Sequence, residues 1–176
     1  MPHPESTVKE AVPNACNQCH LDKSVNWAIR ESKRMWPPQF ANAYPSTDDV
    51  FDQPEGVRAL FAGDALTRSM AAEALGGGGP MKLDTLSTLP FLIEACADDY
   101  PIVRFFALQG IASQEPRLGK PDYLAPPPAQ IRIGDQLWQK LLALRPDQST
   151  SLRDRAMTLA QMLRKRRTNV DLQVGE

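Results

Sequence analysis

The middle of the chain reads Leu89-Pro-Phe-Leu-Ile-Glu-Ala-Cys-Ala-Asp-Asp-Tyr-Pro-Ile-Val-Arg-Phe-Phe-Ala-Leu-Gln-Gly-Ile-Ala-Ser113, and this stretch decides the fold. Two apolar runs, 89–97 and 102–113, are separated by a short polar break that ends in proline, as in two helices joined by a turn. Pro90 is tolerable in the opening turn of the first helix, because the first N–H groups of a helix have no intrahelical acceptor. The stretch therefore predicts a pair of helices.

The same pattern recurs on both sides of this pair. Three segments share an arginine, an alanine three residues later and an apolar residue seven after the arginine: Arg68-Ser-Met-Ala71 with Leu75, Arg104-Phe-Phe-Ala107 with Ile111, and Arg153-Asp-Arg-Ala156 with Ala160. The first two arginines are 36 residues apart, and the third follows 49 residues later. Helix pairs with a period of about 35–45 residues are typical of HEAT-like solenoids. The sequence predicts an all-α protein in which residues 56–176 form a HEAT-like helical repeat array.

An aspartate precedes each repeat arginine, at Asp64, Asp99 and Asp147. We expect each arginine to bond an aspartate or a helix end of its neighbour, because repeat positions serve stacking. In the third copy we expect helices over 131–144 and 151–167. The basic run 164–167 would suit a helix C-terminus.

A cysteine pair and a histidine fall together near the N-terminus, in Cys16-Asn-Gln-Cys19-His20. The whole chain has three cysteines and two histidines, and this CxxCH spacing is the attachment signature of haem c. Two thiols three positions apart on one turn can each add to a vinyl group of the porphyrin, and His20 then lies beneath the iron as its proximal ligand. The motif predicts a single covalently bound haem c.

Other uses of a cysteine pair fit this sequence less well. A thioredoxin-like CxxC follows a strand, and no β-rich run precedes residue 16. A zinc site needs four ligands, and beyond the motif only Cys96 and His3 remain as thiol or imidazole donors. Cys96 lies in an apolar run, where burial of a small residue is the ordinary explanation.

A longer stretch around the motif reads Val12-Pro-Asn-Ala-Cys16-Asn-Gln-Cys19-His20-Leu-Asp-Lys-Ser-Val-Asn-Trp27-Ala28. It resembles a bacterial family of multihaem c-type cytochromes in which such a segment precedes helical repeats of the HEAT or tetratricopeptide kind. The resemblance is close over residues 2–28 and looser afterwards. It implies an extracytoplasmic electron carrier. Members of that family usually carry further CxxCH motifs upstream, and this chain has none.

An electron-transfer haem needs a second axial ligand, normally histidine or methionine. His3 is the first candidate, since the related cytochromes generally use a histidine upstream of the motif. Met81 follows a glycine run and a proline, Met35 precedes Trp36, and a residue of a partner is the remaining alternative. Trp27, seven residues after His20, either packs on the porphyrin edge or anchors its helix by packing.

These observations divide the chain into a haem c attachment segment (1–38), a linker rich in proline, asparagine and aspartate (39–55) and the repeat region (56–176). Within the first part, apolar spacing predicts a helix over 22–35 that ends before Pro37 and Pro38.

Composition and charge exclude some kinds of partner and indicate where the protein is located. A net charge of −1 argues against a nucleic-acid binder. No apolar run approaches the ~20 residues of a membrane span. Residues 1–12 are polar and lack the core of a signal peptide. We therefore expect a processed or larger protein that is periplasmic or extracellular.

The expected function is electron transfer rather than enzymatic catalysis, with redox proteins or other multihaem cytochrome subunits as partners. Two alternatives remain open. The chain is a haem-bearing scaffold or assembly subunit of a larger respiratory or multihaem complex, or its iron has an open site for catalysis or gas sensing.

Overall fold

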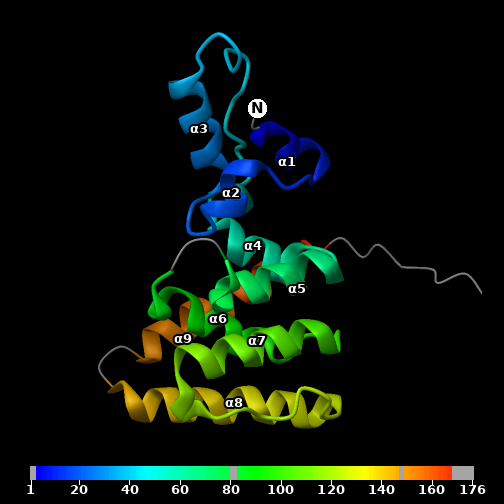
Figure 1. Cartoon of the computed structure of the whole chain (residues 1–176), viewed down its shortest axis with the longest axis vertical. Helices are drawn as coiled ribbons and strands as arrows, with labels where there is room; N and C mark the ends of the chain where they lie inside the picture. Colours follow the sequence, from blue (N-terminus) through cyan, green and yellow to red (C-terminus); the bar gives the residue numbers. More distant parts are fainter. Residues whose placement is uncertain (1–2, 80–82, 147–148, 168–176) are drawn as a thin grey trace, which may run out of the picture.

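The computed structural model describes residues 3–79, 83–146 and 149–167, and this part of the chain is helical without strands. The prediction of an all-α protein is confirmed for it. Figure 1 shows a head of three helices, α1 to α3, standing at one end of a larger array formed by α4 to α9.

The head contains α1 (Pro4–Glu10), α2 (Ala15–Cys19), α3 (Val25–Met35) and the 3₁₀ turn η1 (Asp49–Asp52). Helix α3 begins at Val25 rather than at residue 22, because Ser24 is its N-cap and accepts a hydrogen bond from the Trp27 N–H at 3.0 Å. It ends at Met35, one residue before Trp36 and the two prolines.

The segment after α3 packs back on the head. Phe40 and Ala43 are buried with Val25 and Ile29 of α3 in one apolar cluster. The Asn26 side chain also bonds the backbone of Ser46, from which it accepts an N–H bond at 2.7 Å and to which it donates one at 2.9 Å. Residues 39–55 therefore supply part of the apolar core of the head.

The array consists of three successive helix pairs. They are α4 (Glu55–Ala62) with α5 (Ala65–Glu73), α6 (Thr85–Ala95) with α7 (Pro101–Gln114), and α8 (Pro127–Leu144) with α9 (Ser149–Arg164). The π-helical turn η2 (Ala74–Gly78) extends α5, and the 3₁₀ turn η3 (Pro116–Leu118) follows α7. The expected helix pair around residue 100 is present.

Helix α6 begins earlier than the sequence indicated. Asp84 caps it by accepting a hydrogen bond from the Ser87 N–H at 3.0 Å, so the helix starts at Thr85. Pro90 therefore lies inside the helix and not in its opening turn, which corrects the expectation. A proline there cannot donate the usual backbone hydrogen bond, yet it is buried against the array core.

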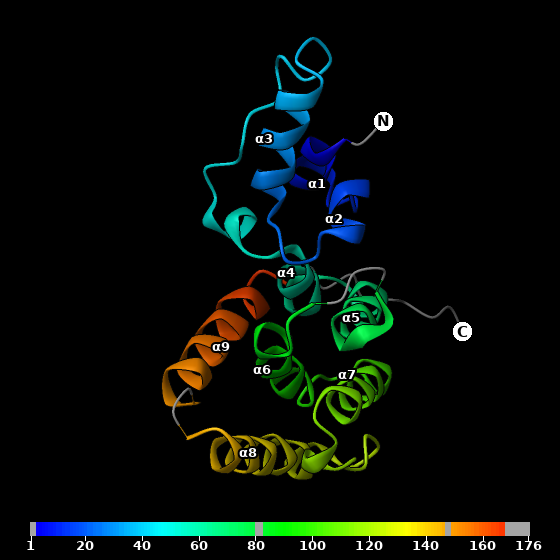
Figure 2. The same ribbon diagram turned by 60° about the vertical axis from the view of Figure 1, so that its left-hand side comes forward.

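The third pair is arranged differently from the first two. Helices α5 and α7 pack side by side, but α9 packs against both α4 and α6 and so crosses back over the earlier pairs. Figure 2 shows α9 along this flank, with α8 across the end of the array. The described array is therefore closed on one side by its last helix.

The first two repeat arginines make matching contacts. Arg68 donates to the Gly63 carbonyl at the end of α4 at 2.8 Å, and Arg104 donates to the carbonyls of Asp98 (2.7 Å) and Asp99 (3.0 Å), which follow α6. Each therefore bonds the end of the preceding helix, as the sequence predicted.

Each of these arginines also reaches forward along the chain. Arg68 bonds the Asp98 carboxylate at 2.9 and 3.1 Å, and Arg104 bonds the Tyr123 carbonyl at 2.9 Å. Arg153 in the third copy instead meets Asp135 at 3.0 Å near the surface; Asp147 lies outside the described residues.

Candidate haem attachment site

The cysteine pair lies on the single turn of α2. The helix starts because the Asn14 side chain accepts a hydrogen bond from the Asn17 N–H at 3.0 Å. It ends at Cys19, and the N–H of the next residue, His20, donates to the Cys16 carbonyl at 2.9 Å. Cys16 and Cys19 thus occupy positions i and i+3 of one turn, and residues three apart on a helix lie on the same side.

The three cysteines have different environments. Cys16 is half-buried, Cys19 is exposed, and both thiols are free. Cys96 is buried in α6–α7 packing, and burial in this apolar core raises the pKa of its thiol far above the ordinary value. The two motif cysteines are therefore at least partly exposed, whereas Cys96 fits the packing role that its apolar surroundings predicted.

The His20 ring lies against Trp27 of α3. The two ring centroids are 5.2 Å apart, and the planes meet at 60° in an edge-to-face arrangement. His20 is half-buried, and so is Trp27. The structure therefore places Trp27 beside His20 across the turn that joins α2 to α3, and not along the face of one helix as the spacing of seven residues implied.

A buried network of polar side chains anchors the turn that carries the motif. It was not predicted from the sequence. The Asn14 amide donates to Thr7 Oγ1 at 3.0 Å and to Asn17 Oδ1 at 2.9 Å. Thr7 in turn donates to the Val12 carbonyl at 2.7 Å. An asparagine just before a short helix is an N-cap signal; the partnership with Thr7 depends on how α1 packs, which has no local signal.

Of the three candidate sixth ligands in this chain, the structure describes His3 and Met35. His3 is exposed at the start of α1, with its ring centroid 6.1 Å from that of Phe40 and its Nδ1 atom 3.3 Å from a Glu5 carboxylate oxygen. Met35 is exposed at the end of α3, and Met81 lies outside the described residues. His3 and His20 thus contact different aromatic rings of the head.

The donor set suits a covalently attached haem. Two free thiols and one imidazole stand on a single capped turn, and the imidazole has an aromatic ring beside it. Within the described ranges, no three His, Cys, Asp or Glu side chains gather as a metal-binding cluster. None of the helices described there has the length and apolar character that crossing a bilayer requires.

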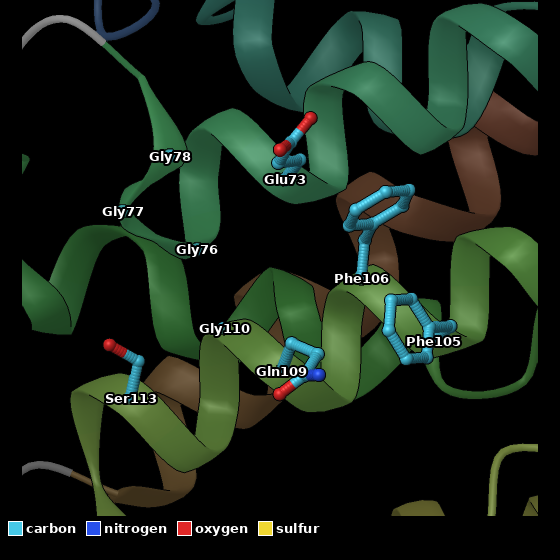
Figure 3. Close-up of a pocket in the computed structure, with 9 residues that line it drawn as sticks. All are labelled: Glu73, Gly76, Gly77, Gly78, Phe105, Phe106, Gln109, Gly110 and Ser113. Atoms are coloured by element: carbon cyan, nitrogen blue, oxygen red, sulfur yellow. The ribbon is translucent and has the colours of Figure 1, made fainter.

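An open hollow of about 340 Å³ lies in the array, between η2 and α7. Figure 3 shows Phe105, Phe106 and Gln109 on one side and Glu73 with the glycine turn on the other. Its lining contains none of the motif residues. It is a surface depression beside a close backbone contact of Gly76 with Gly110.

The chain matches no protein-family model, no curated protein and no solved structure.

Proposed function

We propose that the chain is a c-type cytochrome, or a module of one, that transfers electrons through a haem c bound by Cys16, Cys19 and His20. The observation that carries the proposal is the CxxCH sequence on one capped turn with both thiols free. The resemblance of the sequence around this motif to the haem segment of bacterial multihaem cytochromes also supports the proposal.

Each residue of the turn has a separate task in this proposal. The Cys16 and Cys19 sulfurs hold the group through thioether bonds, and the His20 imidazole is the proximal ligand. Trp27 limits the rotation of that imidazole and covers part of the site. When bound, the haem would supply a one-electron Fe(II)/Fe(III) couple whose potential depends on axial ligands and burial.

We propose His3 as the second axial ligand, on the resemblance to related cytochromes. Its exposed ring lies at the start of α1, a short helix packed against α3. Met35, Met81 and a residue of a partner are the other outcomes, and an absorption spectrum of the oxidised form separates methionine from histidine ligation. A weak far-red band would indicate methionine and contradict His3.

The array would act as a HEAT-like scaffold with docking surfaces for redox proteins or other multihaem cytochrome subunits outside the cytoplasm. One observation favours the second candidate function, a scaffold subunit of a larger complex. Leu66, Met70 and Ile102 on α5 and α7 are large apolar residues with 47 to 69% exposure, and a protein partner that covered them would remove apolar surface from water. Rapid reduction of the isolated chain by a soluble donor would favour the carrier over the scaffold.

The decisive experiment is production in a bacterial periplasm that attaches haem c. We expect the intact mass to rise by one haem and the pyridine adduct of the reduced protein to show a c-type spectrum. Substitution Cys16→Ala together with Cys19→Ala should abolish the added mass, because no thioether bond can form. Cys96→Ala is the matched control and should retain it. Wild-type chains without haem would overturn the proposal.

The coordination state of the haem iron is a separate test, which distinguishes an electron carrier from a protein with an open iron site. Six-coordinate, low-spin iron is expected for an electron carrier. A high-spin spectrum that changes on addition of carbon monoxide would instead indicate an open iron site, and with it the enzyme or gas-sensor alternative.

A further inference from the structure

The two variable positions of the CxxCH motif have opposite environments. Asn17 is 2% exposed, whereas its neighbour Gln18 lies on the exposed side of the same turn. The haem signature itself constrains neither position, since only the thiols and the imidazole bond the group. A buried asparagine must satisfy its amide hydrogens and oxygen inside the protein, so its partners are informative.

The Asn17 side chain bonds the backbone that follows His20. Its amide nitrogen donates to the carbonyl oxygens of His20 at 3.2 Å and Lys23 at 3.0 Å, and lies 3.5 Å from that of Ser24. Its Oδ1 atom accepts from the Asn14 amide at 2.9 Å. One side chain therefore holds both ends of the turn that leads from His20 into α3.

The array also forms hydrogen bonds with this turn. The N–H groups of Glu55 and Gly56, at the start of α4, donate to the carbonyls of Lys23 and Leu21, each at 2.9 Å. The first N–H groups of a helix lack intrahelical acceptors, so these bonds satisfy both partners. The backbone after His20 is thus bonded both by Asn17 and by the array, and the Lys23 carbonyl accepts from each.

We propose that Asn17 is a positioning residue for the axial ligand His20. Because its amide bonds the His20 carbonyl directly, it sets the backbone from which the imidazole extends, and Trp27 then restricts the remaining rotation of the ring. Outer groups that orient a metal-ligating histidine tune the site without touching the metal. This inference rests on the proposed function, since it assigns His20 to iron.

The test compares matched substitutions at the two neighbouring positions. Asn17→Asp has nearly the same shape and keeps an oxygen for Asn14, but it places a second oxygen against the carbonyls of His20 and Lys23. Gln18→Glu makes the same chemical change on the exposed side of the turn. A third variant, Thr7→Val, removes a member of the polar network that does not touch the turn after His20.

The readouts are the haem-loaded fraction by intact mass, the electron paramagnetic resonance spectrum of the oxidised iron and its midpoint potential. We expect Asn17→Asp to lower the loaded fraction several-fold and to shift the resonance and the potential of the chains that are loaded. Gln18→Glu and Thr7→Val should match the wild type in the resonance spectrum. Far-UV circular dichroism verifies that all three variants fold.

Two results would overturn the assignment. If the Asn17→Asp spectrum equals that of Gln18→Glu, Asn17 does not position the ligand. If Thr7→Val alters the spectrum as much, the network has only a general structural role.

The failure of the proposed function has a different signature, namely a wild-type chain without haem. In that case hydrogen exchange at the amides of His20 and Lys23 still tests whether Asn17 holds this backbone. Both amides are hydrogen-bonded here, and only Asn17→Asp should accelerate their exchange. Equal exchange in the Asn17→Asp and Gln18→Glu variants would refute the positioning role.

Discussion

At the scale of residues, Asp98 shows how one side chain connects separate segments of the array. One carboxylate oxygen accepts from Arg68 Nε at 2.9 Å and from Arg167 Nη2 at 3.1 Å, and the other accepts from Arg68 Nη2 at 3.1 Å and the Tyr100 N–H at 3.0 Å. The side chains of Arg68 and Asp98 are each 3% exposed. Burial of a charge lowers stability unless the charge is paired. The loss of one partner therefore leaves the other as a buried, unpaired charge.

Two adjacent substitutions test this account. Asp98→Ala should lower the free energy of unfolding by about 3–5 kcal/mol, because it leaves the Arg68 guanidinium buried without its counterion. Asp99→Ala removes a carboxylate that is 79% exposed and pairs with Arg167, so its cost should stay within about 1 kcal/mol. Denaturation in urea measures both. Similar losses in the two variants would contradict the burial argument.

For the repeat arginines, Arg68 and Arg104, the sequence predicted the type of contact but not the particular partner. Asp64, the nearest upstream aspartate, instead caps α5, where the Thr67 N–H and the neighbouring Arg68 lower its carboxyl pKa. The partner of Arg68 is 30 residues away in sequence and is brought close by helix packing. Asn17 shows the same limit. The motif predicted the chemistry of Cys16, Cys19 and His20 from residue types alone, whereas the partners of Asn17 depend on the folded turn.

At the scale of elements, η2 and α7 make a close backbone approach in the array. A β-carbon built on Gly110 would lie 2.5 Å from the Gly76 α-carbon, and one built on Gly76 would lie 2.7 Å from the Gly110 α-carbon. Only glycine at both positions permits this backbone contact. The glycine run 76–79 is visible in the sequence, but nothing in the sequence indicates that this turn meets α7, because that depends on which helix lies alongside.

Replacement of glycine by alanine should change stability in opposite directions at two helical positions, 110 and 134. Gly110→Ala forces η2 and α7 apart, and overpacking of this kind costs about 1–3 kcal/mol. Gly134→Ala on α8 meets only the Ile93 carbonyl oxygen, at 4.0 Å, and should stabilise the helix by about 0.5–1 kcal/mol. Thermal melts report both changes as shifts of Tm in opposite directions. A stabilised Gly110→Ala variant would show that the two backbones are not in contact.

At the scale of the whole molecule, the head and the array have separate apolar clusters that meet at Phe51. The head cluster contains Val25, Ile29, Phe40 and Ala43, and Phe51 packs against both this cluster and the array core. Arg166, just beyond α9, also pairs with Asp48 before η1 at 2.9 Å. The content of proline, asparagine and aspartate suggested a linker over 39–55. The burial of its apolar residues is decided by the fold around them.

The role of Phe51 leads to a prediction about how the two parts unfold together. Phe51→Ala removes the ring that both clusters share, so α3 should open more often while α7, inside the array core, keeps its protection. Hydrogen exchange measured on peptides from α3 and α7 separates these two events. Tyr44→Ala is the control, because that ring is 69% exposed and contacts Lys33 at the surface. Equal acceleration in α3 and α7 would mean that the head and the array form one cooperative unit through other contacts, such as the backbone bonds from α4 to the turn after His20.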